Sequence, residues 1–213
     1  MSNIVLIHGF ATGIRFSIFR APQGTDAGFE GFREDIARGT ALPFRWDISD
    51  EASFFDVFNP RFTRQVFIKE HLRAQNSAWQ ERLIQFLEDE QPSTILCHSL
   101  GCVFMLETMN RFGIPPSVHT IVFNQSALPT SAELTNPTIQ QRITARTLQC
   151  INTYCPWDPT LWIGMIIERA WLNGLFPTRK TWLTNLFFPL YLLPNLHTSA
   201  IRSQRFRDWV FSL

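Results

Sequence analysis

The sequence lacks an excess of charge of either sign. Its 19 lysine and arginine residues nearly balance its 18 aspartate and glutamate residues, and no long run of one charge occurs. A protein that follows a phosphate backbone needs a basic patch or stripe, so nucleic acid is not an expected partner. A chain of 213 residues with 45% hydrophobic content can bury one large core, and we therefore expect one domain over residues 1–213.

Cysteine is also scarce. The four cysteines lack the short spacings to histidine that a tetrahedral zinc site needs; they are Cys97, Cys102, Cys150 and Cys155. Their surroundings in the sequence are apolar, so buried free thiols are the simpler interpretation. The sequence therefore indicates neither a metal site nor a bound cofactor.

The patterns of a secretory leader and of a membrane span are both missing. Met1 is followed within two residues by an apolar strand pattern, without the basic, apolar and small-residue segments of a leader, so we expect the cytoplasm. Residues 182–196 are apolar but shorter than the ~20 residues that a bilayer core requires, and Pro189 and Pro194 interrupt them. Core packing is the simpler interpretation of residues 182–196, and a transient contact with a membrane or lipid surface is the alternative.

Short apolar segments alternate with helical patterns along the chain. Strands are predicted at residues 3–7, 42–48, 94–97, 120–124 and 148–154, and helices at 29–38, 77–90, 102–112, 137–146, 161–172 and 201–213. Ser77 and Gln80 have the spacing of a capping box at the start of one of these helices. The alternation predicts an α/β protein, a three-layer α/β/α sandwich whose mostly parallel sheet has about six strands joined by right-handed crossovers.

The strongest functional signal is Ser99, between a predicted buried strand and a predicted helix. The segment reads Thr94-Ile-Leu-Cys-His-Ser-Leu-Gly-Cys102. A serine hydroxyl is a weak nucleophile, so an enzyme that uses one must lift it clear of the backbone and place it beside a base. A sharp turn does this and requires a small residue such as Gly101. The alternative is a serine that only caps the helix.

This segment resembles the nucleophile elbow, Gly-x-Ser-x-Gly, of the α/β-hydrolase family. The resemblance extends over most of the chain and implies that family's fold without its N-terminal hairpin, with Ser99 as nucleophile and His98 and Gly101 as parts of the motif. Cys97 stands where the family usually has glycine. The resemblance also implies an oxyanion hole made by the backbone N–H groups of Leu100 and Phe10, the latter following a buried strand that ends in His8 and Gly9. For His8 itself we expect a structural role.

The family's chain order implies the partners of the serine. An acid follows a later strand and a histidine lies near the C-terminus, which points to Asp158 and His197. Asp158 precedes a proline and could instead be a turn residue, and Glu168 is the fallback acid. The strand that the family places just before the histidine is broken by prolines here. The triad implied is Ser99, Asp158 and His197.

These residues together imply acyl transfer without a metal or a cofactor. The segments expected around the site, residues 11–25, 50–70 and 159–196, are rich in aromatic and aliphatic side chains, which favours a small apolar carboxylic ester as substrate. The sequence leaves open an amidase or thioesterase with the same triad. It also leaves open a non-catalytic relative of the fold that binds a ligand or a protein.

Overall fold

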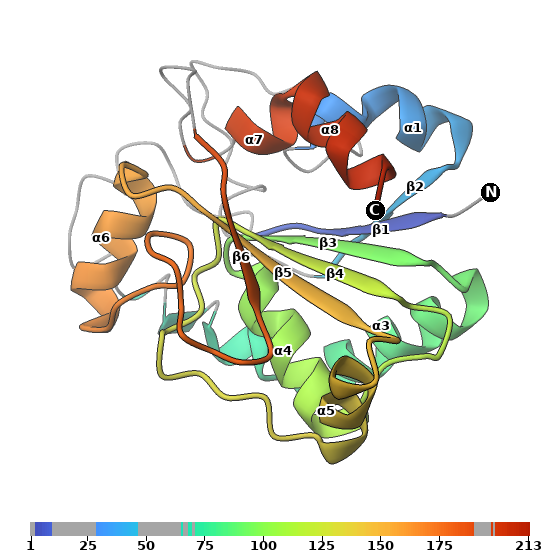
Figure 1. Ribbon diagram of the computed structural model, residues 1–213, viewed down its shortest axis with the longest axis horizontal. Helices are drawn as coiled ribbons and strands as arrows, with labels where there is room; N and C mark the ends of the chain where they lie inside the picture. The colour runs from blue at the N-terminus through green and yellow to red at the C-terminus, as the bar shows by residue number, and fades with distance from the viewer. Residues whose placement is uncertain are drawn as a thin grey trace.

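Six parallel strands form one continuous sheet. The computed structural model describes residues 3–9, 29–46, 65, 68–69, 71–189, 197 and 199–213, apart from the side chain of Glu168. The strands are β1 (Ile4–Ile7), β2 (Ala41–Phe44), β3 (Thr94–His98), β4 (Thr120–Asn124), β5 (Gln149–Tyr154) and β6 (Thr184–Phe187). Every neighbouring pair is parallel, and the order is β2-β1-β3-β4-β5-β6 (Figure 1).

The order of the strands reverses between β1 and β3. The chain passes from β1 outward to β2 and then returns across β1 to form β3, after which each strand is added on the other side. The segments that leave the carboxyl ends of β1 and β3 therefore turn toward opposite faces of the sheet. In open α/β sheets this is where a crevice forms and ligands bind.

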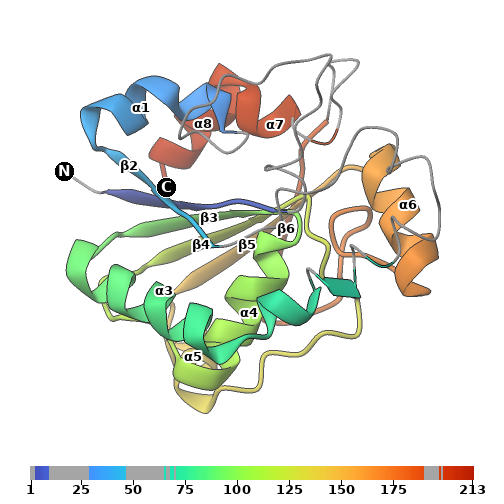
Figure 2. The same cartoon turned by 180° about the vertical axis from the view of Figure 1, so that it is seen from behind.

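Helices cover both faces of the sheet. The described helices are η1 (Glu30–Phe32), α1 (Arg33–Arg38), α3 (Ser77–Glu90), α4 (Gly101–Phe112), α5 (Pro137–Thr144), α6 (Pro159–Glu168), α7 (Ser199–Arg202) and α8 (Gln204–Phe211). Figures 1 and 2 show α1, α7 and α8 on one face, and α3, α4 and α5 on the other. Helix α6 lies beyond the edge where the strands end. This arrangement is a three-layer α/β sandwich.

The core divides in two because successive side chains of a strand point to opposite faces. Val5, Ile95 and Phe123 lie in the larger cluster under α3 and α4. Leu6 and Leu96 lie in the smaller cluster beneath η1 and the C-terminal helices. All residues of β1, β3 and β4 are buried, as a parallel strand covered on both faces requires.

The α/β architecture and the parallel sheet predicted from the sequence are confirmed, whereas several element ends were wrong. Helix α6 begins at Pro159 rather than 161 and ends at Glu168 rather than 172. The predicted terminal helix is two helices, α7 and α8, separated at Ser203, whose hydroxyl accepts from Phe206 N. The capping box was also wrong, because the Asn76 side chain caps α3 by accepting from Ala78 N.

Of residues 182–196, residue 182 lies in a turn, residues 184–187 form β6, and residues 183, 188 and 189 belong to no helix or strand. Residues 190–196 lie outside the described part. Within the described residues, no helix combines the length and apolar character needed to cross a bilayer.

Candidate active site

Ser99 occupies the turn between β3 and α4 with a backbone conformation that is unusual for serine. Its φ is +54°, in the left-handed region that non-glycine residues rarely adopt. The turn is held by backbone hydrogen bonds, from Ser99 N to Asn124 O at 3.1 Å and from Ala127 N to Ser99 O at 3.2 Å. Strain of this kind is stored where the surrounding structure requires it, commonly at functional sites.

Two glycines allow the carboxyl end of β1 to pack closely against this turn. A Cβ atom on Gly101 would lie 2.5 Å from His8 O and 2.7 Å from Ile7 O. A Cβ atom on Gly9 would lie 2.5 Å from the Cβ of Ser99 and 3.1 Å from Leu100 N. Both approaches are too close for any side chain, so these positions require glycine.

The Leu100 N–H is available as a hydrogen-bond donor. Leu100 is the N-cap residue of α4, and among the described residues its N–H has no acceptor. Gly9 lies beside it, and the positive end of the α4 dipole adds to the field there. The arrangement can hold an anion at this position. Phe10, predicted as the second donor, lies outside the described residues.

His8 contacts Trp46 through both its backbone and its ring. Trp46 Nε1 donates to His8 O at 3.1 Å, and the two rings stack at 5.9 Å. Trp46 in turn stacks on Phe104 of α4 at 4.6 Å. Burial lowers the pKa of His8 to about 4, so its ring is neutral near neutral pH.

Asp158 accepts hydrogen bonds on both carboxylate oxygens. Oδ1 accepts from Thr160 N at 2.9 Å and Leu161 N at 3.2 Å, which caps α6. Oδ2 accepts from His197 Nδ1 at 2.7 Å and from Gln125 Nε2 at 2.8 Å. One oxygen of Asp158 therefore caps the helix that follows it, and the other contacts His197 and Gln125.

The charge of Asp158 is stabilised although the residue is fully buried. Burial alone would raise the pKa of this carboxyl, but the adjacent His197 and the hydrogen bonds from His197, Leu161 and Gln125 outweigh it, and its pKa is lowered. An ionised Asp158 accepts a hydrogen bond from His197 Nδ1. A neutral imidazole that donates from Nδ1 leaves its Nε2 unprotonated, and Nε2 can then act as a base.

His98 holds the backbone of His197. Its Nε2 donates to His197 O at 3.0 Å, and the two rings lie 4.7 Å apart. Burial, followed by the nearby His197, lowers the pKa of His98 to about 3, so the ring stays neutral and keeps its proton for this bond. Because His98 is adjacent to Ser99, it links the turn to the segment that carries His197.

Ser99, Asp158 and His197 thus lie in one neighbourhood, although they are distant in sequence. Ser99 is 6% exposed and the His197 side chain 14% exposed, so both are mostly shielded from water. No hydrogen bond joins these two described residues, and among the described residues His197 Nε2 has no partner. In unliganded enzymes the bond between nucleophile and base is often long and tightens when substrate binds.

Two residues at this site were missed from the sequence. Gln125 follows β4, and its amide contacts Asp158. Trp46, which supports His8, follows β2. A polar residue directly after a buried parallel strand was the available signal for Gln125, and no sequence signal links Trp46 to His8.

The other predicted groups can be placed only in part. The side chain of Glu168, the fallback acid, lies outside the described residues. The cysteines are free and buried, and burial raises the pKa of Cys97, Cys102 and Cys150, the last to about 12. Within the described part of the chain, no three His, Cys, Asp or Glu side chains are grouped to hold a metal ion.

Apolar side chains surround the acid side of this site. Asp158 caps α6, and large side chains near this helix are more than a third exposed: Trp157, Trp162, Ile163, Ile166 and Trp171. Trp162, Trp171 and Phe176 contact one another edge to face, with centroids 5.4–6.4 Å apart. The surface on and around α6 is therefore apolar.

Comparison with known proteins adds no assignment: no protein-family model matches the chain, and no curated protein matches its sequence.

Proposed function

We propose that this chain is a serine hydrolase of the α/β-hydrolase type, which cleaves an apolar carboxylic ester by acyl transfer. The observation that carries the proposal is the 2.7 Å hydrogen bond between His197 and the buried Asp158, next to a serine with φ of +54° in a strand-to-helix turn. A serine that only capped a helix would need neither the strained backbone nor an adjacent carboxylate–imidazole pair.

Each residue has a defined role in this reaction. Ser99 Oγ attacks the carbonyl carbon while His197 Nε2 takes its proton, and the resulting oxyanion is held by the Leu100 N–H. As the intermediate collapses, the ester C–O bond breaks and His197 returns the proton to the departing alcohol. A water molecule, deprotonated by His197, then releases the acid and restores Ser99. Asp158 keeps His197 in the required tautomer and stabilises its protonated form.

The apolar side chains on and around α6 favour the apolar ester as substrate. Trp157 and Trp162, 47% and 36% exposed, flank the residue that orients the base. An acyl chain that lies along them would remove apolar surface from water, at about 25 cal/mol per Å² buried. A charged substrate would gain nothing from this surface.

The proposal is tested by the reactivity of Ser99. Wild type should be labelled by a fluorophosphonate probe and should hydrolyse p-nitrophenyl esters, with rates that increase from short to longer acyl chains. Ser99→Ala should abolish labelling and lower kcat by about 10⁴-fold or more, because the covalent intermediate cannot form. His197→Ala should cause a similar loss, since the hydroxyl then lacks its base.

A matched histidine variant provides the control. His119 lies outside the site, with its ring Nδ1 3.3 Å from Thr147 O, and His119→Ala should retain full activity. Labelling that survives Ser99→Ala would exclude Ser99 as the nucleophile. If wild type is neither labelled nor active, a non-catalytic binding protein becomes the better interpretation.

A further inference from the structure

Gln125 adopts the same rare backbone conformation as Ser99, at the end of the neighbouring strand. Its φ is +45°, against +54° for Ser99. His98 pairs with Asn124 in the sheet, so the two residues that follow them lie side by side. Glycine or asparagine would adopt this conformation at lower cost, so the glutamine side chain requires an explanation.

A directional chain of hydrogen bonds fixes the Gln125 amide. Thr153 Oγ1 donates to Asn124 Oδ1 at 2.7 Å, and Asn124 Nδ2 donates to Gln125 Oε1 at 3.2 Å. Gln125 Nε2 then donates to Asp158 Oδ2 at 2.8 Å. Thr153, Asn124 and Asp158 are fully buried, and Gln125 is 2% exposed. If the Gln125 amide were flipped, its NH2 group would face the NH2 group of Asn124, and its oxygen would face the Asp158 carboxylate. Of the two orientations, the observed one satisfies every group.

The oxygen that Gln125 contacts is the one that accepts from His197 Nδ1. Together with the two backbone N–H groups on Oδ1, these bonds give the carboxylate four donors. Among the described residues, Gln125 is the side chain besides His197 that donates to this carboxylate. The amide of Gln125 and the imidazole of His197 therefore share Oδ2 as their acceptor.

We propose that Gln125 is a positioning residue that, oriented by Asn124 and Thr153, fixes the Asp158 carboxylate and sets the proton affinity of His197. The inference rests on the proposed function for its catalytic meaning. Gln125 itself does not touch the reacting atoms, because it acts through Asp158.

Few other titratable groups face this cluster in the described residues. His98, at the end of β3, contacts His197. His8, at the end of β1, is close enough to lower the pKa of His98. Burial keeps the pKa of His98 at about 3 and that of His8 at about 4, so both remain neutral in a neutral assay. The cysteine of the turn between β5 and α6, Cys155, accepts from Asp158 N through its carbonyl at 3.3 Å. A change in the acid limb of the pH profile therefore reports on Asp158 and His197.

Two substitutions of Gln125 test the proposal. Gln125→Met removes a donor from Asp158 and so exposes His197 to more of its negative charge; kcat should fall about tenfold, with little change in KM, and the acid limb should move to higher pH. Gln125→Glu places a second carboxyl against Asp158. Two buried carboxyls this close share one proton, so the new side chain, in its protonated form, donates to Asp158 Oδ2, and the acid limb should stay nearer to that of wild type than in Gln125→Met.

The chain offers matched controls for two features of Gln125, its positive φ and its buried amide donor. Gln91 has φ of +46° and donates through Nε2 to a backbone carbonyl, and Gln80 is 1% exposed and donates to Ala74 O. Gln91→Met and Gln80→Met change the same side chain away from the site and should leave the pH profile unaltered. Thr153→Val removes the far end of the chain and should give a smaller change in the same direction as Gln125→Met.

The measurements are the pH dependence of kcat/KM and the midpoint of the His197 ring titration by NMR. An unmoved limb and an unmoved midpoint in Gln125→Met would overturn the proposal, and if that variant does not fold, the same result in Thr153→Val overturns it. The proposal would also be overturned if Gln91→Met or Gln80→Met moved the acid limb and the His197 midpoint as far as Gln125→Met does. If wild type is inactive, the proposed function fails, and the ring midpoint still decides whether Gln125 sets the proton affinity of His197.

Discussion

At the scale of single residues, the site depends on how closely two pieces of backbone approach. Gly101 and Gly9 let the end of β1 contact the turn that carries Ser99, with no space for a side chain on either. Cys97, in contrast, stands where the α/β-hydrolase family usually has glycine, and its side chain is fully buried in the core beneath α4. The steric requirement here therefore falls on Gly101 and Gly9 rather than on position 97.

Gly101→Ala should consequently damage both the fold and the site. Its methyl group would overlap two backbone carbonyl oxygens, at 2.5 and 2.7 Å, which cannot rotate away. We expect a loss of about 1–3 kcal/mol in the free energy of unfolding, measured with urea. The proposed esterase activity should fall by a larger proportion, because β1 and the turn must separate.

Gly164→Ala is the matched control for this substitution. Gly164 lies within α6, and the nearest atom to an added Cβ would be the flexible end of Leu172, at 3.4 Å. Alanine is favoured over glycine in a helix by about 1 kcal/mol, so this variant should be as stable as wild type or more stable. Equal losses from the two variants would contradict the steric interpretation of Gly101.

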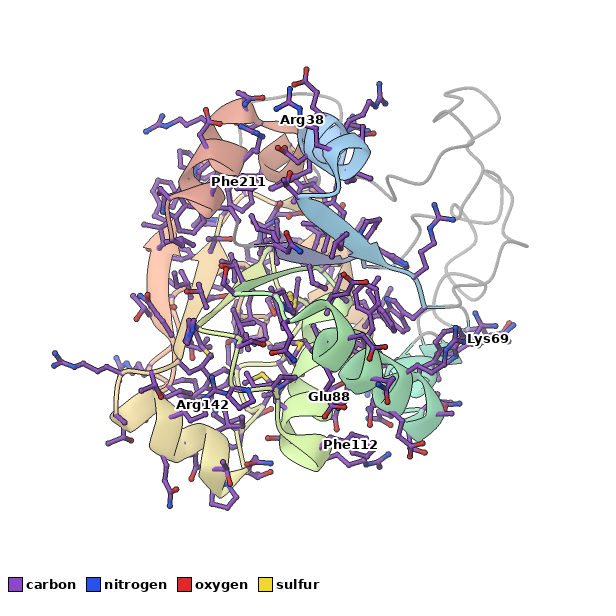
Figure 3. The ribbon with its side chains drawn as sticks, turned by 90° about the vertical axis from the view of Figure 1, so that its right-hand side faces the viewer. Arg38, Lys69, Glu88, Phe112, Arg142 and Phe211 are labelled. Carbon is purple, nitrogen blue, oxygen red and sulfur yellow. The ribbon has the colours of Figure 1, made fainter. Side chains whose placement is uncertain are left out.

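At the scale of elements, the C-terminal helices are fastened to η1 and α1 by two ion pairs. Arg202 forms two hydrogen bonds with Glu30, at 2.7 and 2.8 Å. Arg207 forms two with Asp35, both at 2.5 Å, and these bonds raise the pKa of its guanidinium. Figure 3 shows α1 and α8 adjacent on one face of the sheet. Since α7 begins two residues after His197, these contacts also restrain the position of the proposed base.

Arg207→Met should therefore destabilise the protein and lower its activity. Asp35 is 3% exposed and would lose its charged partner, which we expect to cost about 2–4 kcal/mol in the free energy of unfolding. Activity should fall further than the unfolded fraction explains, because α7 and α8 hold His197 in place.

Arg38→Met provides the control, because Arg38 pairs with Glu34 at the solvent-exposed end of α1, as labelled in Figure 3. Their side chains are 65% and 80% exposed, and the substitution should cost at most about 0.5 kcal/mol. The two variants are compared by thermal and urea unfolding. If Arg207→Met is no more harmful than Arg38→Met, the pair with Asp35 does not hold the terminal helices.

At the scale of the whole molecule, the layered α/β arrangement could be predicted from the sequence, whereas the strand order could not. Alternation of buried strands with helical patterns dictates a parallel sheet, because a parallel strand needs a crossover. The reversal between β1 and β3 depends on long-range packing that no local pattern encodes. The order Ser99, Asp158, His197 pointed to one site, but Gln125 and Trp46 belong to it through contacts across strands, which spacing along the chain does not reveal.

The site also determines how the whole molecule responds to acid. His8 and His98 are buried with pKa values of about 4 and about 3, while an unfolded histidine has a pKa near 6.5. Between these values the unfolded chain binds protons that the folded chain excludes, so stability must decrease as the pH falls. Asp158 acts in the same direction at lower pH, because its pKa is lowered in the fold and its contribution disappears as the pH falls below about 4.

The free energy of unfolding should therefore be nearly constant above pH 7 and fall steeply between about pH 6 and 4, by a few kcal/mol for each histidine. Unfolding at pH 5 should take up about two protons, which gives a slope of roughly 2.7 kcal/mol per pH unit. His98→Gln should remove about one of these protons and flatten the slope, whereas His119→Gln, at an exposed position, should leave it unchanged. Urea unfolding at a series of pH values measures both. A stability that stays constant from pH 7 to 4 would mean that the buried rings of His8 and His98 accept protons within the folded protein. The interpretation of His98 as a neutral donor to the His197 backbone would then be wrong.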